Sequence, residues 1–114
     1  MANNFKNAFA TSVSTSSGSP TDVYTSNNGS AVNSILIECD VANTGTSALT
    51  VTVMIYDSSS TNTYHIVKNA PIPVGGALKV VSGQKVVLNG DDKLQVYASA
   101  STVDVVASIL QDVS

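Results

Sequence analysis

The chain has 114 residues, of which 43% are hydrophobic, 11% charged and 5% aromatic, with a formal net charge of -3 and a sequence pI of about 4.6. This length fits a single domain, and the acidic balance lacks the basic patch with which proteins bind nucleic acid, so no nucleic-acid partner is expected. The one Cys and one His exclude an intramolecular disulfide and a four-ligand zinc site, and every apolar run is far shorter than the roughly 20 residues of a membrane-spanning helix.

Residue usage favours β-structure. Val and Ser each occur 17 times and Thr occurs 11 times, whereas Glu occurs once. Residues branched at Cβ fit strands, while Glu, Leu, Lys and Ala favour helices. The many Ser and Asn residues suggest disorder as an alternative, but the mean hydropathy of +0.20 is higher than disordered chains show. Only residues 14–22 are expected to form a flexible loop.

Period-two alternation of apolar residues, which is typical of half-buried strands, recurs along the chain. Its cleanest instance, over 48–57, places every second residue from Leu49 to Ile55 on one face. A second instance, over 31–41, turns the odd-numbered residues toward the core and Leu36 away from it. The predicted strands cover residues 5–13, 23–25, 31–41, 48–57, 63–68, 78–81, 84–88, 93–99 and 102–111.

The polar loop 58–62, between the predicted strands 48–57 and 63–68, is of hairpin length, and three further connections carry turn signals. The Gly-containing segment 43–47 predicts a hairpin that pairs the strands on either side of it. Asn89-Gly90 predicts another hairpin, because both residues tolerate positive φ. Segment 70–76 holds two Pro and two Gly residues, so it is expected to cross an edge or an end of the domain.

Strands at a spacing of about ten residues, with no helical segment between them, predict an all-β fold. The expected architecture is an antiparallel β-sandwich, jelly-roll-like, with about eight strands. Residues 1–114 form one domain in this interpretation. Residues 1–20 are expected to serve as an N-terminal arm or as a strand exchanged between subunits.

Apolar residues on the outward faces of the predicted strands favour self-association. The charged fraction of 11% is below the roughly 25% of ordinary domains, so the surface is suited to being covered by neighbours. Both Phe residues lie in the first nine positions, where an arm could add a strand to another subunit. Two alternatives remain open. The Phe rings pack into the core of their own subunit, and the other outward apolar residues are the scattered exposed residues that most soluble proteins carry. The candidate interface residues are Phe5, Phe9, Met54, Tyr56 and Tyr97.

The sequence predicts no catalytic, cofactor-binding or metal-binding residue, so the protein is not expected to be an enzyme. His65 lies inside a predicted strand, with no Gly-x-Ser-x-Gly motif anywhere in the chain. Cys39 alternates in phase with apolar neighbours, which predicts a buried small hydrophobic residue. Asp91 and Asp92 lack the spacing of a calcium loop and are expected to form a turn.

Segments 65–73, 87–96 and 103–110, with the opening residues 1–9, resemble small structural proteins of tailed bacteriophages, most closely those of phages of marine bacteria and cyanobacteria. The shared pattern is an apolar strand, a Gly-Asp turn, a strand of alternating Leu and Val, a Ser-rich turn and a closing Val-rich strand. It covers roughly half the chain and carries no catalytic motif.

The resemblance implies a virion protein made in the host cytoplasm. It would be a capsid decoration (cement) protein, a dimer or trimer that stabilises the phage head by contacts with the major capsid protein or another virion protein. The alternative is a small tail or fibre component that binds a host surface receptor or glycan. The chain has no Trp and only four Tyr residues for stacking on sugars, which weakens this alternative. Since no secretory signal is visible at the N-terminus, export is not expected.

Overall fold

The computed structural model describes residues 4–26 and 33–113, which form eight strands and no helix. No helix capable of crossing a membrane therefore occurs in the part of the chain that is described. The strands are β1 (Asn4–Thr11), β2 (Thr21–Thr25), β3 (Asn33–Asn43), β4 (Leu49–Asp57), β5 (Asn62–Ile72), β6 (Ala77–Leu88), β7 (Lys93–Ala98) and β8 (Val103–Val113).

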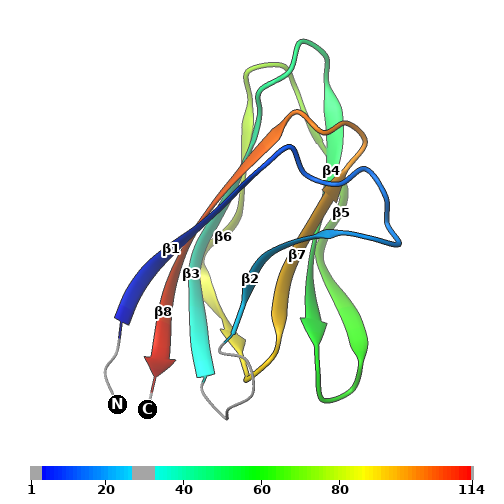
Figure 1. Cartoon of the computed structure of the whole chain (residues 1–114). Helices are drawn as coiled ribbons and strands as arrows, with labels where there is room; N and C mark the ends of the chain where they lie inside the picture. The colour runs from blue at the N-terminus through cyan, green and yellow to red at the C-terminus, as the bar shows by residue number, and fades with distance from the viewer. Residues whose placement is uncertain (1–3, 27–32, 114) are drawn as a thin grey trace.

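The strands form two four-stranded antiparallel sheets that pack face to face (Figure 1). The order is β1-β8-β3-β6 in the first, called sheet A, and β2-β7-β4-β5 in the second, called sheet B. Only β4 and β5 are both consecutive in the chain and neighbours in a sheet, and every other connection crosses between sheets. This strand order is that of a jelly roll, so the predicted all-β sandwich is confirmed.

Segment 58–62 joins the antiparallel neighbours β4 and β5, as its hairpin length predicts, but the other two predicted hairpins are wrong. Segment 43–47 connects β3 in sheet A to β4 in sheet B, and Asn89-Gly90 connects β6 in sheet A to β7 in sheet B. Positive φ occurs at Asp91, with a φ of 70°, rather than at the Asn-Gly pair. Turn chemistry reverses the chain in both places, but it does not decide which sheet the next strand joins.

The core lies between the sheets and consists mainly of Val, Leu and Ile side chains. Alternate residues of β8, from Val103 to Ile109, are at most 1% exposed. In β3 the register shifts between Leu36 and Glu38, and this irregularity turns Leu36 into the core beside Cys39. The predicted outward position of Leu36 and the predicted inward position of Ile35 are therefore wrong, because a bulge changes the face on which later residues lie. The predicted strands 78–81 and 84–88 are one strand, β6.

Polar side chains connect the sheets at the end where β8 terminates. The Tyr24 hydroxyl lies 3.1 Å from Ser34 Oγ and donates to Gln111 Oε1 at 2.9 Å, which links β2 to β3 and β8. Asp92, only 4% exposed, accepts from the Ser58 backbone N–H at 3.0 Å and from the Asn89 backbone N–H at 3.0 Å. The predicted role of Asp92 in a turn is therefore confirmed.

At the opposite end, one Asn side chain connects two loops. Asn43 is 4% exposed, and its Nδ2 donates to the carbonyl oxygens of Ser47, Ile72 and Pro73 at 2.9 to 3.3 Å. Its Oδ1 accepts from the Gly45 backbone N–H at 2.9 Å. The predicted edge position of 70–76 is also confirmed, because β5 is the last strand of sheet B.

Asn43→Ala is expected to lower the free energy of unfolding by about 2 kcal/mol, because truncation removes the buried hydrogen bond to the Ile72 carbonyl oxygen together with the bonds that join Asn43 to Ser47 and Gly45. Urea unfolding followed by circular dichroism measures this change. Asn62→Ala is the matched control, since Asn62 is exposed and its truncation is expected to cost less than about 0.5 kcal/mol. Equal losses in the two variants would contradict the role given to Asn43.

Candidate functional site

The outer face of sheet A carries both Phe residues of the chain. Phe5 and Phe9 lie on the outward side of β1, where their side chains are 81% and 62% exposed. The alternative in which they pack into their own core is therefore wrong. Phe is among the residue types most often buried, so two exposed Phe rings on one short strand form an unusually apolar part of the surface.

Strand pairing continues this apolar surface as one row of residues from β1 to β6. Phe5 pairs with Leu110, which pairs with Ile35 on its other side, and Ile35 pairs with Val87. These four residues, called the apolar row, run from β1 to β6. Val87 is 60% exposed, and Leu110 and Ile35 are partly exposed. Since neighbouring strands lie about 4.8 Å apart, the row is roughly 15 Å long.

A second row begins apolar and ends charged. Phe9 pairs with Val106, Val106 with Asp40, and Asp40 with Lys79, whose Nζ lies 3.7 Å from Asp40 Oδ1. Partial burial and the neighbouring carboxylate of Glu38 raise the pKa of Asp40, although Lys79 opposes this effect. The apolar surface is thus bounded by an ion-paired corner.

Two hollows lie between β1 and β8 on this face. One has a volume of about 280 Å³ and is bordered by Phe5, Asn7 and Ser108. The other has a volume of about 250 Å³ and is bordered by Phe9 and Val106. The outer face of sheet A therefore has two exposed rings, those of Phe5 and Phe9, with a hollow beside each.

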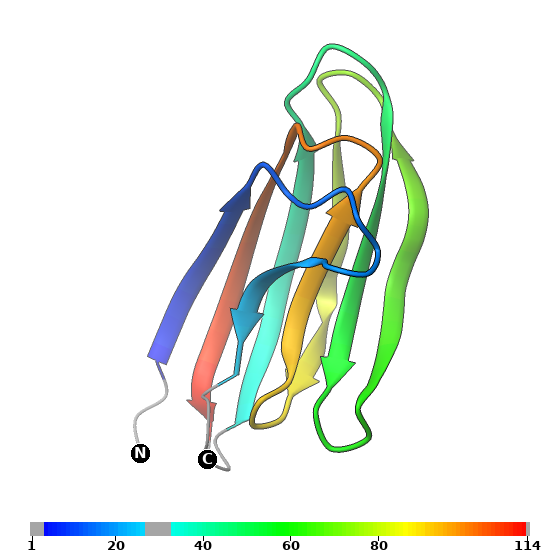
Figure 2. The same cartoon turned by 45° about the vertical axis from the view of Figure 1, so that its right-hand side comes forward.

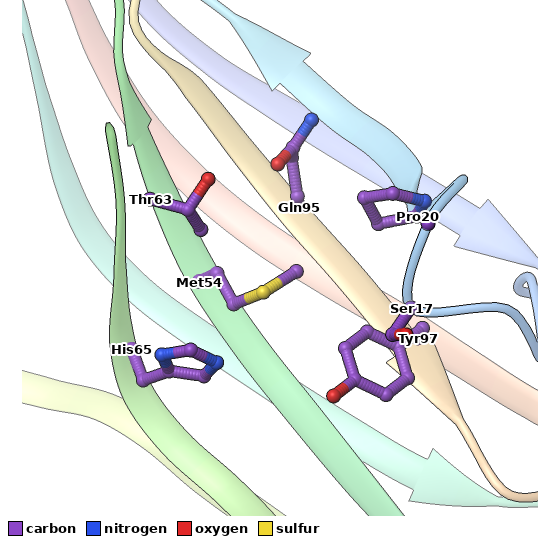
Figure 3. A pocket seen from close by; sticks show the side chains of 8 residues that line it. Ser17, Pro20, Met54, Thr63, His65, Gln95 and Tyr97 are labelled. Carbon is purple, nitrogen blue, oxygen red and sulfur yellow. The ribbon is translucent and has the colours of Figure 1, made fainter. Parts of the chain in front are cut away.

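The outer face of sheet B has a pocket of about 400 Å³ (Figure 3). Met54 on β4 lies between His65 on β5 and Tyr97 on β7. The lining residues are Ser17, Gly18, Pro20, Met54, Thr63, His65, Gln95 and Tyr97. Hydroxyl, amide and imidazole groups around a thioether and a phenol ring suit a small ligand with both polar and apolar surfaces.

The connection between β1 and β2 forms one wall of this pocket. It leaves sheet A after Thr11 and passes over β7, as Figure 2 shows. The Ala98 backbone N–H donates to the Ser14 carbonyl at 3.0 Å, and the Ser14 N–H donates to Thr21 Oγ1 at 2.8 Å. These bonds hold the Ser-rich segment, predicted as a flexible loop, against sheet B.

The five predicted interface residues lie on two faces. Phe5 and Phe9 lie on sheet A, whereas the other three lie on the outer side of sheet B. Met54 is 4% exposed beneath the pocket, and the ring of Tyr56 has Lys93 Nζ 5.8 Å from its centre. A single interface cannot contain all five. Sequence reasoning missed the pocket, because its wall depends on where a polar loop packs.

His65 and Cys39 have different environments. His65 is exposed at the rim of the pocket, on the strand where it was predicted. Cys39 is fully buried in the core, as predicted, and desolvation raises the pKa of its thiol to about 12, with a smaller effect from the Asp40 carboxylate. In the described parts of the chain, no three His, Cys, Asp or Glu side chains come close enough to hold a metal ion.

Comparison with protein-family models, with curated proteins and with solved structures finds no match for this chain.

The buried thiol of Cys39 is expected to lower the free energy of unfolding as the pH rises above about 9. The thiol of the unfolded chain ionises near its ordinary pKa of 9.0, whereas the folded protein retains the proton up to about 12, so alkaline pH favours unfolding. Cys39→Ala should flatten this dependence in urea unfolding measured between about pH 8 and pH 10.5. Equal slopes in the two proteins would show that burial of the thiol does not contribute.

Proposed function

We propose that this protein is a non-enzymatic structural subunit of a virion, a capsid decoration protein that packs by the outer face of sheet A. The apolar row, together with the exposed rings of Phe5 and Phe9, is the observation that supports this proposal. The resemblance of the sequence to small phage structural proteins supplies the setting. In that setting the partners are other copies of the chain and the major capsid protein.

The energetics suit such a role. Full burial of one exposed Phe side chain is worth about 1.5 to 3 kcal/mol, so a few such side chains give a weak individual contact. Many copies on one shell turn weak contacts into stable attachment, because each bound site holds its neighbours close. A subunit that binds only the assembled shell shifts the equilibrium toward assembly by mass action.

The wild-type chain is expected to form an oligomer whose mass depends on concentration, and the double variant Phe5→Ser/Phe9→Ser is expected to have the 11.7 kDa mass of one chain. Size-exclusion chromatography with multi-angle light scattering, over a concentration series, measures both. Tyr64→Ser is the matched control, because Tyr64 is 55% exposed on β5 of the other sheet. A wild-type monomer at every concentration would contradict self-association.

A second candidate function is supported by the pocket on sheet B. There a saccharide could stack on the exposed part of Tyr97 and form hydrogen bonds to His65 and Gln95. This function corresponds to a tail or fibre component that recognises a host surface glycan. It uses a face different from the one that carries Phe5 and Phe9.

Under this second candidate, the wild-type chain should bind at least one member of an array of bacterial surface polysaccharides. Tyr97→Ala is expected to lose that signal because the stacking surface is removed. Phe5→Ser/Phe9→Ser should retain it, since neither ring lines the pocket. An array on which the wild-type chain binds nothing, or a signal that survives Tyr97→Ala unchanged, would contradict the candidate.

A further inference from the structure

The sandwich has four edge strands, β1 and β6 in sheet A and β2 and β5 in sheet B. Three of them are irregular. β5 contains Pro71 and has two register shifts against β4, β6 has two register shifts against β3, and β2 has five residues and one shift. Short length, Pro and bulges are the devices by which β proteins prevent an edge from pairing with another chain.

β1 is neither short nor bulged and has no Pro, and the one protective device it carries is a single charge, Lys6, on the side of the strand that faces the core. All eight of its residues pair with β8 in an unbroken register, none has positive φ, and Lys6 is its only charged residue. In Figure 2, β1 is the outermost strand of sheet A, and its second edge has no partner strand among the described residues. A regular, nearly uncharged edge with two exposed Phe rings is suited to pairing with a further strand.

We propose that this further strand is β1 of a second copy, paired antiparallel about a two-fold axis at Asn7. The inference rests on the proposed assembly function and specifies its first contact. Phe5 and Phe9 each lie two residues from Asn7, so this register places Phe5 opposite Phe9 of the partner subunit and the two Asn7 residues opposite each other. A two-fold interface of this kind is self-complementary.

The positions of Phe5 and Phe9 favour the register centred on Asn7 over the registers centred on other residues of β1. Centring the pair on Phe5 or on Phe9 would place one ring opposite its own copy and leave the other ring without an aromatic partner. Centring on Asn7 pairs both, and cross-strand aromatic pairs are among the favourable contacts of antiparallel sheets. Lys6 then lies opposite the partner's Ala8, so the two ammonium groups are not directly opposed.

The pairing also extends the apolar surface. The apolar row of one copy ends at Phe5, which would contact the partner's Phe9 and, through it, the partner's Val106. The dimer would have one continuous eight-stranded sheet whose outer face carries two such surfaces. This arrangement gives the proposed decoration protein a larger face with which to contact a shell.

Disulfide trapping tests the register. Paired residues in antiparallel strands have Cα atoms about 4.5 to 5.5 Å apart, within the range that a disulfide spans. Asn7→Cys oxidised with diamide is therefore expected to give a covalent dimer on a non-reducing gel. Thr11→Cys is the matched control on the same face of β1, because its two copies would lie roughly 27 Å apart in this register. Cys39 is buried and stays in place in every variant.

A mixture of two variants provides a second, independent measurement. Phe5→Cys and Phe9→Cys chains should cross-link to each other when mixed, whereas each alone should not, because identical positions would lie about 13 Å apart. Each variant keeps one of the two rings. Mass spectrometry of the linked peptides identifies which positions are joined.

The outcomes separate this inference from the proposed function. Cross-linking of Asn7→Cys but not Thr11→Cys, in a chain that associates by light scattering, supports both. If the wild-type chain associates but Asn7→Cys does not cross-link, the strand pairing is overturned while assembly by the face of sheet A stands. If the wild-type chain is a monomer at every concentration, both are overturned.

Discussion

The structure depends on the burial of one face of each sheet against the other. Alternate residues of β4, β7 and β8 are apolar and point inward, and the two sheets exclude water between them. Any two-layer sandwich built in this way leaves two outer faces and the edges of both sheets in contact with solvent. The side chains on these exposed faces and edges differ in chemistry, and the candidate functions follow from that difference.

The two outer faces differ in chemistry. The outer face of sheet A carries exposed apolar side chains in two rows, with polar pairs such as Asn7–Ser108 beside them and an ion pair at one corner, while sheet B carries polar side chains and a loop that folds over it. A broad face with exposed apolar rows suits a protein partner, since protein interfaces need complementary area rather than depth. A pocket with mixed polarity suits a small ligand. The two proposed functions therefore use separate surfaces, and variants of one need not disturb the other.

The sequence predicts the strands well and their partners poorly. Period-two alternation identifies β4, β7 and β8 because it reflects local burial, but the pairing of β1 with β8 joins residues that are far apart in the chain. No local signal records such a pairing. The two wrong hairpin predictions failed for the same reason, and Leu36 was misplaced because one bulge reverses the alternation that follows. The sequence placed Phe5 and Phe9 on one face of a strand, but whether that face is buried or exposed depends on how the strand packs against the rest of the fold.

The pairing of the first strand with the last has a consequence for synthesis of the protein. Thr11 and Asp104 share a side-chain hydrogen bond at 2.6 Å across 93 positions of sequence. On the ribosome, β1 emerges first and has neither of its edges covered until β8 has been translated. Nascent chains on one polysome would therefore expose matching strands to each other at high local concentration. In this fold, the order in which the chain is made gives neighbouring copies access to β1 before its own partner exists.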